Sequence, residues 1–213
     1  MKKLFRKIKN FFFCLKYPVW KFYRWDYSKR KYKLDYSTTW YESIPIGWRK
    51  AFGKQLSEEL TKVAKEEFKR VRKEPLKYKE YKKNSLQRVI SWSDIKEKYG
   101  ELRLDCSCTT DKIQDVLNKY ELLSIGYCIY CGKPARYKTG GWITFMCEDC
   151  FNNYLDGFGN EKIKLQCLEK DRLTKKDIPA IYSYHKGMNG KLIKKRINIK
   201  KKYGIDFKSL WDI

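Results

Sequence analysis

The sequence CIYCGKPARYKTGGWITFMCEDC, residues 128–150, decides how this chain folds, because it carries two Cys-X-X-Cys pairs at a fixed separation. The pairs are Cys128 with Cys131 and Cys147 with Cys150, and fifteen residues lie between them. Each pair offers two sulfurs on one tight turn, and two such turns close a tetrahedral shell around Zn²⁺. The spacing is that of a zinc ribbon, so the stretch predicts a structural zinc site.

Other uses of these cysteines fit the pattern less well. Gly132 follows the first pair, where it lets backbone amides turn toward the sulfurs. A redox pair needs only one Cys-X-X-Cys motif, and a catalytic zinc keeps an open position and commonly takes His or carboxylate ligands. A second metal site remains open from the other cysteines and the single histidine, which are Cys14, Cys106, Cys108, Cys167 and His185. Scattered cysteines are more commonly buried as small hydrophobic side chains.

The composition predicts a folded and strongly cationic protein. Of its 213 residues, 42% are hydrophobic and 16% aromatic, which is enough apolar surface for a real core. Lys and Arg number 49 against 25 Asp and Glu, a formal net charge of +24. Such an imbalance suits an anionic partner, which could be nucleic acid, an anionic membrane surface or an acidic protein face. A solvated lysine-rich surface without a partner is the alternative.

The cysteine usage and the N-terminal sequence predict a reducing compartment. Eight cysteines would indicate disulfides only in a short secreted chain. The N-terminal sequence MKKLFRKIKNFFFCLKYPVW has an uncharged run, residues 10–15, that is shorter than the hydrophobic region of a signal peptide. No stretch approaches the about 18 apolar residues of a membrane span. We therefore expect a cytosolic protein.

Two helical patterns precede the central strands. In residues 1–47, Lys and Arg alternate with aromatic residues, which predicts a basic amphipathic helix followed by an irregular arm. From Trp48, apolar residues recur every three or four positions. This spacing predicts one long helix that Pro75 stops.

Two strands and a further helix are expected before the cysteine stretch. Extended runs at residues 86–92 and 102–104 flank the segment SDIKEKYG, in which Gly100 supplies the turn. Residues 110–124 carry apolar side chains on one helical face, and Gly126 is expected to stop that helix.

The tail after the cysteine stretch predicts a basic hairpin. Two strand-like runs are joined by the turn dipeptide Asn189 and Gly190, and residues 191–202 contain seven Lys or Arg and no acid. The fold class expected is α+β, with a helix, a short β-hairpin, a second helix and the four-cysteine ribbon. The regions expected are a basic aromatic arm at 1–47, an α+β core at 48–126, the ribbon at 127–154 and a basic region at 155–213.

The residues needed for common catalytic mechanisms are scarce. His185 is the only histidine, which removes most Ser/His and Cys/His mechanisms, and a surface histidine at a strand end is the simpler interpretation. No phosphate-binding or dinucleotide-binding glycine motif is present. The remaining enzymatic alternative is a metal-dependent nuclease that uses Asp94, Glu97, Glu101 and Asp105. We expect a non-enzymatic binding protein with no catalytic residue, because acids alternating with Lys are common on solvated hairpins.

Nucleic acid or a nucleoprotein complex is the leading expected partner, since cations neutralise phosphates and aromatic rings stack on bases. The residues expected to make these contacts are Lys7, Lys9, Lys16, Trp20, Lys21, Arg24, Trp25, Lys133, Arg136, Lys138, Lys191, Lys194, Lys195 and Arg196. The N-terminal block also fits a helix lying on an anionic membrane surface. A third alternative is an inhibitor that docks on an acidic face of a host protein complex.

Three strings in the central region stand together: IPIGWRKAFGKQLSEEL, IKEKYGELRLD and YELLSIGYCIYCGKPARYKTGGWITFMCEDC. Over about residues 40–151 they resemble a family of small zinc-ribbon proteins of bacteriophages and prophages. The positions that carry the resemblance are Trp48, Arg49, Gly100, Leu102, Arg103, Ser124 and Trp142. The resemblance implies a phage origin and action in the host cytoplasm, on host machinery or defence, and it implies no mechanism.

Overall fold

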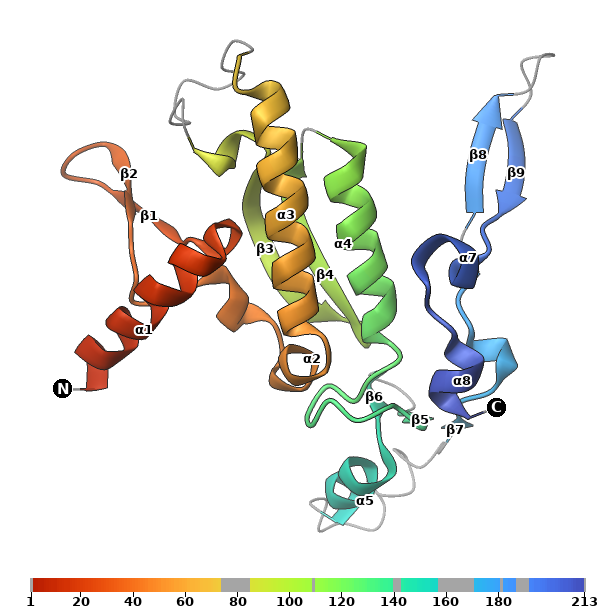
Figure 1. Cartoon of the computed structure of the whole chain (residues 1–213). Helices are drawn as coiled ribbons and strands as arrows, with labels where there is room; N and C mark the ends of the chain where they lie inside the picture. Colours follow the sequence, from red (N-terminus) through yellow and green to blue (C-terminus); the bar gives the residue numbers. More distant parts are fainter. Residues whose placement is uncertain are drawn as a thin grey trace.

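The computed structural model describes residues 2–73, 85–108, 110–139, 143–156, 171–180, 182–186 and 192–212. Over these residues the chain is an α+β protein, as predicted, in which helices accompany small antiparallel hairpins (Figure 1). The strands so described form three two-stranded hairpins and one three-stranded sheet. None of the helices in these ranges has the length and apolarity that crossing a bilayer requires.

The N-terminal region contains a helix and a β-hairpin. Its elements are the helix α1 (Lys2–Lys16), the short 3-10 helices η1 (Pro18–Trp20) and η2 (Trp40–Ser43), and the strands β1 (Tyr23–Asp26) and β2 (Lys31–Leu34). α1 is the helix that the basic amphipathic pattern predicts. The expectation of an irregular arm after this helix is wrong, because β1 pairs antiparallel with β2. Asp26 stabilises the turn, since its carboxylate accepts hydrogen bonds from the backbone N–H groups of Ser28 and Lys29.

Two helices replace the single long helix expected from Trp48. They are α2 (Ile46–Ala51) and α3 (Gly53–Val71). Phe52 leaves helical geometry between them, with φ −142° and ψ 4°. The apolar spacing of residues 48, 52 and 56 continues across this break, so the periodicity alone does not reveal it.

A long hairpin and a helix follow. Their bounds, with the short 3-10 helix before them, are η3 (Leu86–Arg88), β3 (Ile90–Lys98), β4 (Glu101–Cys108) and α4 (Asp111–Ser124). The turn falls at Tyr99 and Gly100, as predicted, and Gly100 has φ 79°. The segment SDIKEKYG is strand over most of its length and not a loop, because its polar side chains alternate with buried Ile95. α4 begins at the N-cap Thr110, whose hydroxyl accepts from the N–H of Ile113.

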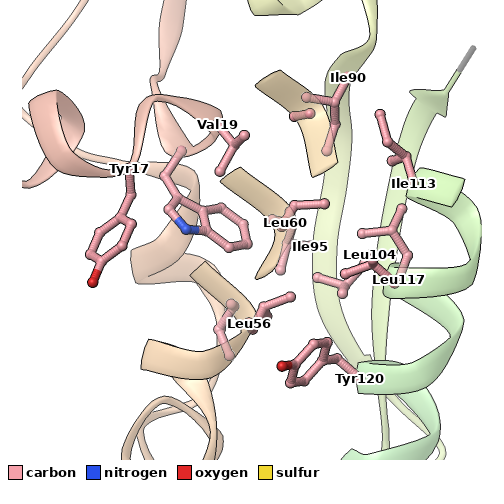
Figure 2. Packing of buried hydrophobic residues seen from close by; sticks show 14 of the residues in the cluster. Tyr17, Val19, Leu56, Leu60, Ile90, Ile95, Leu104, Ile113, Leu117 and Tyr120 are labelled. Carbon is pink, nitrogen blue, oxygen red and sulfur yellow. The ribbon is translucent and has the colours of Figure 1, made fainter. Parts of the chain in front are cut away.

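The main hydrophobic core lies where α3 and α4 pack against the β3–β4 hairpin (Figures 1 and 2). Leu56 and Leu60 of α3 meet Leu117 of α4 there, and all three are fully buried. Trp20 from η1 enters the same core, where it stacks on Trp92 with ring centroids 5.0 Å apart. The segment before residue 47 is therefore part of the main packing unit and not a detached arm.

The cysteine region and the C-terminal region share a second set of elements. These are β5 (Tyr137–Lys138), β6 (Phe145–Met146), α5 (Glu148–Asp156), β7 (Asp171–Arg172), η4 (Lys175–Asp177), β8 (Tyr182–Lys186), β9 (Leu192–Arg196), α7 (Ile199–Tyr203) and α8 (Phe207–Trp211). The three-stranded sheet has the order β6-β5-β7, so a strand after the cysteine region completes it. β8 pairs antiparallel with β9, whereas the turn dipeptide expected between them, Asn189 and Gly190, lies outside the described residues.

A second hydrophobic cluster joins α4 to the C-terminal helices. It contains Ile125, Leu173, Phe207 and Trp211, all buried. α4 ends just before Gly126, as expected: its last residue is Ser124 and its C-cap is Ile125, which keeps right-handed helical geometry. Gly126 also belongs to this contact. A Cβ on Gly126 would lie 2.3 Å from Leu210 Cδ2, so close packing explains the glycine.

Candidate metal centre and basic aromatic groove

Four cysteine side chains converge at one point in the structure. Cys128 and Cys131 lie on the turn that follows α4, Cys147 comes directly after β6, and Cys150 is in the first turn of α5. Their Sγ atoms all lie within 4.8 Å of one another. The Sγ atoms of Cys131 and Cys147 are 3.5 Å apart, too far for a disulfide, and all four thiols are free. The predicted ligand set is thus assembled as a cluster that could hold a metal ion.

The first cysteine turn is held against the start of α2. The N–H of Gly132 donates to the carbonyl of Cys128 at 3.0 Å, and Gly132 has φ 83°. A Cβ on Gly132 would lie 2.5 Å from the carbonyl oxygen of Gly47. The N–H of Gly47 in turn donates to the carbonyl of Ile129 at 2.9 Å. Two glycines far apart in sequence therefore allow two backbones to touch.

Trp48 adds a side-chain bond to this contact. Its indole Nε1 donates to the backbone carbonyl of Tyr127 at 3.2 Å, and the ring is fully buried. The strings IPIGW and YCIYCG are far apart in the sequence, and they are in contact in the folded protein. The cysteine turn is consequently anchored to the main core and does not depend on the metal alone for its position.

The pKa values of Cys131, Cys147 and Cys150 are shifted in different directions. Burial and the neighbouring thiols raise the pKa of Cys147 and Cys150. Burial acts in the same direction on Cys131, but hydrogen bonds from the Lys133 backbone and from the other thiols outweigh it and lower the pKa of Cys131. Four adjacent thiolates repel one another, so full deprotonation of this cluster requires a cation between the sulfurs. The donor set, four soft sulfurs in a closed cluster, fits Zn²⁺.

Two of the three basic residues predicted for binding in the cysteine region form contacts within the protein. Arg136 Nη1 donates to the backbone carbonyl of Leu210 at 3.2 Å, and Lys138 forms an ion pair of 2.6 Å with Asp177. Both side chains are half-buried and make structural contacts, and their role in partner binding stays a prediction. Lys133 is exposed and forms a 2.8 Å ion pair with Asp149, which joins the two cysteine turns at the surface.

The alternative metal sites do not form among the described residues. The four acids considered for a nuclease lie on the β3–β4 hairpin, where Asp94 pairs with Lys96, Glu101 with Arg103, and Glu97 accepts from the N–H of Gly100. Within the described part of the chain, the four cysteines are the one group of three or more potential ligands. Cys167 lies outside this part, as do the side chains of Cys108 and His185. Cys14 is buried in α1.

The other basic and aromatic residues predicted for binding are distributed over three elements. On α1, Lys7, Lys9 and Lys16 are exposed, as predicted. Arg24 and Trp25 are exposed on β1, and Lys21 is half-buried just before it. On β9, Arg196 is exposed, Lys194 and Lys195 are placed as backbone only, and Lys191 lies outside the described residues.

The prediction that Trp20 contacts a nucleic acid is wrong, because this ring is buried. The sequence favours an exposed ring that stacks on bases, yet no part of Trp20 is accessible. Its Nε1 donates to Ser57 Oγ at 2.9 Å, which satisfies the buried indole and ties η1 to α3. Its alternation with lysines in the sequence does not distinguish a core ring from a surface one.

A groove beside β1 and β2 gathers aromatic residues that sequence reasoning did not select. It encloses about 520 Å³, and Tyr23, Tyr32 and Trp92 contribute aromatic walls. Because Trp25 is opposite Tyr32 in the hairpin register, both rings lie on one face, with centroids 4.9 Å apart. The available signal was the alternation of aromatic and charged residues in residues 23–26 and 31–34, which is typical of a strand.

Polar and cationic groups surround the same groove. Lys21, Ser85, Gln87 and Ser91 line it, and Arg30 and Lys31 line a smaller hollow together with Trp25 and Tyr32. The arrangement combines flat rings, hydrogen-bonding groups and positive charge.

The chain matches no protein-family model, no curated protein and no solved structure.

Proposed function

We propose that this protein is a non-enzymatic, zinc-stabilised protein that binds single-stranded nucleic acid in the aromatic groove beside β1 and β2. The observation that carries the proposal is the exposed ring pair of Trp25 and Tyr32, 38% and 48% accessible, on a hairpin that also carries Arg30 and Lys31. Aromatic rings stack on bases without regard to sequence, and cations neutralise phosphates. The hairpin meets both requirements.

The exposed rings favour a single strand. Trp25 and Tyr32 lie edge to face at 69°, so each ring can stack on a separate unpaired base, and Gln87 and Ser91 supply hydrogen-bonding groups for base edges. Duplex bases are stacked on one another and do not expose their faces to such rings. We place the activity in a bacterial host cell, on the strength of the resemblance of residues 40–151 to bacteriophage proteins.

The metal in this proposal is Zn²⁺, and its role is structural. Four cysteine ligands fill the tetrahedral shell, which leaves no position for a water or substrate. The ion would hold Cys128 and Cys131 against Cys147 and Cys150, and would thereby fix α5 and the β5–β6 strands on the turn that Gly47 and Trp48 anchor.

Fluorescence anisotropy with labelled single-stranded oligonucleotides tests the proposal. The wild-type protein should bind at low salt, with an affinity that falls steeply as salt rises. Because stacking contributes about 1–3 kcal/mol per base, the double variant Trp25→Ala, Tyr32→Ala should bind at least tenfold more weakly. The matched control is Tyr99→Ala, which removes an exposed ring from the distant β3–β4 turn and should leave affinity unchanged.

A charge series separates phosphate contacts from general attraction. Arg30→Gln with Lys31→Gln should reduce the salt dependence, whereas Lys54→Gln with Lys62→Gln on the exposed face of α3 should not. Absence of binding to single-stranded DNA and RNA at 50 mM salt would overturn the proposal. An equal loss in both charge variants would show that only net charge matters, which also contradicts a defined groove.

A further inference from the structure

α1 turns its apolar face toward solvent. Six large apolar side chains of this helix are between 40% and 70% exposed, and they are Leu4, Phe5, Ile8, Phe11, Phe12 and Leu15. Their spacing places all six within one stripe of the helix, as in an amphipathic helix that faces a core. Here no core covers the stripe among the described residues. A contiguous exposed apolar patch of this kind marks an interaction site.

The opposite side of α1 explains why the stripe cannot turn inward. Asn10 and Cys14 are the buried residues of the helix, and Asn10 Nδ2 donates to the carbonyl of Tyr36 at 3.1 Å. Arg6 adds a 3.1 Å ion pair with Glu42, the residue that caps η2. The helix is thus attached through the side that carries Asn10, Cys14 and Phe13, whose ring packs on the main core. It lies at the edge of the molecule (Figure 1).

Cations lie along both edges of the stripe. With about 100° of rotation per residue, Lys7 lies beside Phe11 at one edge, and Lys9 and Lys16 lie beside Phe5 at the other. All three lysines are exposed. α1 contains six Lys or Arg and no acidic residue. Long cationic side chains at the borders of an apolar stripe can extend outward and place their charges above it.

A groove extends the stripe toward the β1–β2 hairpin. It encloses about 770 Å³ between the two elements, and Ile8, Phe11 and Phe12 form its apolar wall. Arg24 and Lys33 face it from the hairpin. Trp25 lines this groove as well, whereas Tyr32 does not and lines the nucleic-acid groove instead.

We propose that α1 is a membrane-binding helix that lies in the plane of an anionic phospholipid surface, with its apolar stripe among the acyl chains and its lysines at the phosphates. Charge complementarity selects this occupant, because interfacial helices combine bulky apolar side chains with a Lys-rich border. A second copy of the chain would bring six cations against six across an apolar contact. A helix of 15 residues spans about 22 Å, which is too short to cross the bilayer.

Vesicle flotation with the full chain tests the proposal. The wild-type protein should float with vesicles of phosphatidylcholine containing about one third phosphatidylglycerol, and much less with phosphatidylcholine alone, as an electrostatic contribution requires. Phe5→Ser with Phe12→Ser should reduce the bound fraction at least tenfold, because it removes two of the most exposed rings. Tyr99→Ser, a similar change at an exposed site elsewhere, should have no effect.

The charge border is tested by Lys7→Gln, Lys9→Gln and Lys16→Gln together, against Lys54→Gln, Lys62→Gln and Lys65→Gln on α3. The first triple variant should lose binding to the anionic vesicles and the second should keep it. Equal flotation of wild type and the Phe5, Phe12 variant would overturn the proposal. So would a dimer in size-exclusion chromatography that this variant dissolves, since the stripe would then be covered by a second copy.

The membrane and nucleic-acid proposals fail independently. The Phe5, Phe12 variant leaves the nucleic-acid groove intact and should bind oligonucleotides as wild type does. Tyr32→Ala alone, at a ring that lines the nucleic-acid groove and not the groove beside α1, should bind vesicles as wild type does. Circular dichroism of both variants, compared with wild type, verifies that the substitutions leave the helical content unchanged.

Discussion

The indole Nε1 of Trp48 donates a hydrogen bond to the backbone carbonyl of Tyr127, 3.2 Å away, at the junction between the main core and the cysteine cluster. The contact joins the head of α2 to the residue before the first metal ligand. Gly47 reinforces it, because its N–H donates to the carbonyl of Ile129. The position of the cluster is therefore set by the core as well as by the four sulfurs.

Replacing Trp48 by Phe should destabilise the protein by at least about 2 kcal/mol. The substitution leaves the Tyr127 carbonyl without its partner, which costs about 1–3 kcal/mol, and it opens a cavity where a fully buried ring stood. Urea unfolding followed by circular dichroism measures the change. Trp25→Phe, at an exposed ring, should stay within about 0.5 kcal/mol of wild type. Equal stability of the two variants would contradict the anchoring role of Trp48.

Gly132→Ala should cost more than Gly204→Ala, although both glycines have positive φ, 83° and 72°. The shared cost of left-handed geometry is about 1–2 kcal/mol. At Gly132 the new Cβ would also lie 2.5 Å from the backbone carbonyl of Gly47, whereas nothing lies within 4 Å of it at Gly204. The Gly132 variant should therefore unfold at lower urea concentration and retain less zinc. Similar midpoints for both variants would show that the close approach is relieved without cost.

The purified protein should contain one zinc ion per chain, measured by inductively coupled plasma mass spectrometry. Chelation should lower the free energy of unfolding by several kcal/mol, because the binding energy of a structural zinc is part of the folding energy. Cys131→Ser should lose the metal, while Cys106→Ser on β4 should keep it. Full zinc content in the Cys131 variant would remove this thiol from the ligand set.

Cys14 should resist alkylation at pH 8. Burial raises the pKa of its thiol from 9.0 to about 11, even though the charge of Lys21 acts in the opposite direction. The thiolate fraction in the folded state is then about a hundredfold lower than in the unfolded state. Mass spectrometry of the peptide containing Cys14, after iodoacetamide treatment with and without denaturant, reports the ratio. A native rate within threefold of the denatured rate would contradict this environment.

The same shift has a defined effect on stability. A thiol whose pKa is higher in the folded state favours folding fully below the unfolded value of 9.0. This contribution is lost as pH rises from 9 toward 11. Cys14→Ala should therefore flatten the loss of stability over this alkaline window, as followed by thermal unfolding at several pH values.

Local patterns in the sequence predict much of this molecule. The two Cys-X-X-Cys pairs predict the cluster, because tight turns bring their sulfurs together whatever surrounds them. Thr110 and the apolar spacing after it predict α4, and Gly100 predicts the turn of the long hairpin. These features depend on neighbouring residues, so a single sequence contains their cause.

Features that depend on distant contacts are missed. Phe52 interrupts a helix while preserving its apolar period, and the buried Trp20 belongs to the same basic and aromatic stretch of sequence as the exposed Trp25. In the sequence Lys138 cannot be distinguished from a surface lysine, because its ion-pair partner Asp177 comes from a later element. The orientation of α1 is predicted only in part. The sequence predicts an amphipathic helix, but only the fold shows that its apolar stripe faces outward and that the other side is attached to the protein.

The bond between Trp48 and Tyr127 also has a consequence in time, since the two residues are 79 positions apart. At a synthesis rate of about 5–20 residues per second, Trp48 is added to the chain roughly 4–16 seconds before its acceptor Tyr127. During that interval α2 lacks its contacts with the cysteine turn, because that turn has not yet been synthesised. The contact between α2 and the cysteine turn therefore forms only after that turn has been synthesised, although every buried residue of the main core precedes it in the sequence.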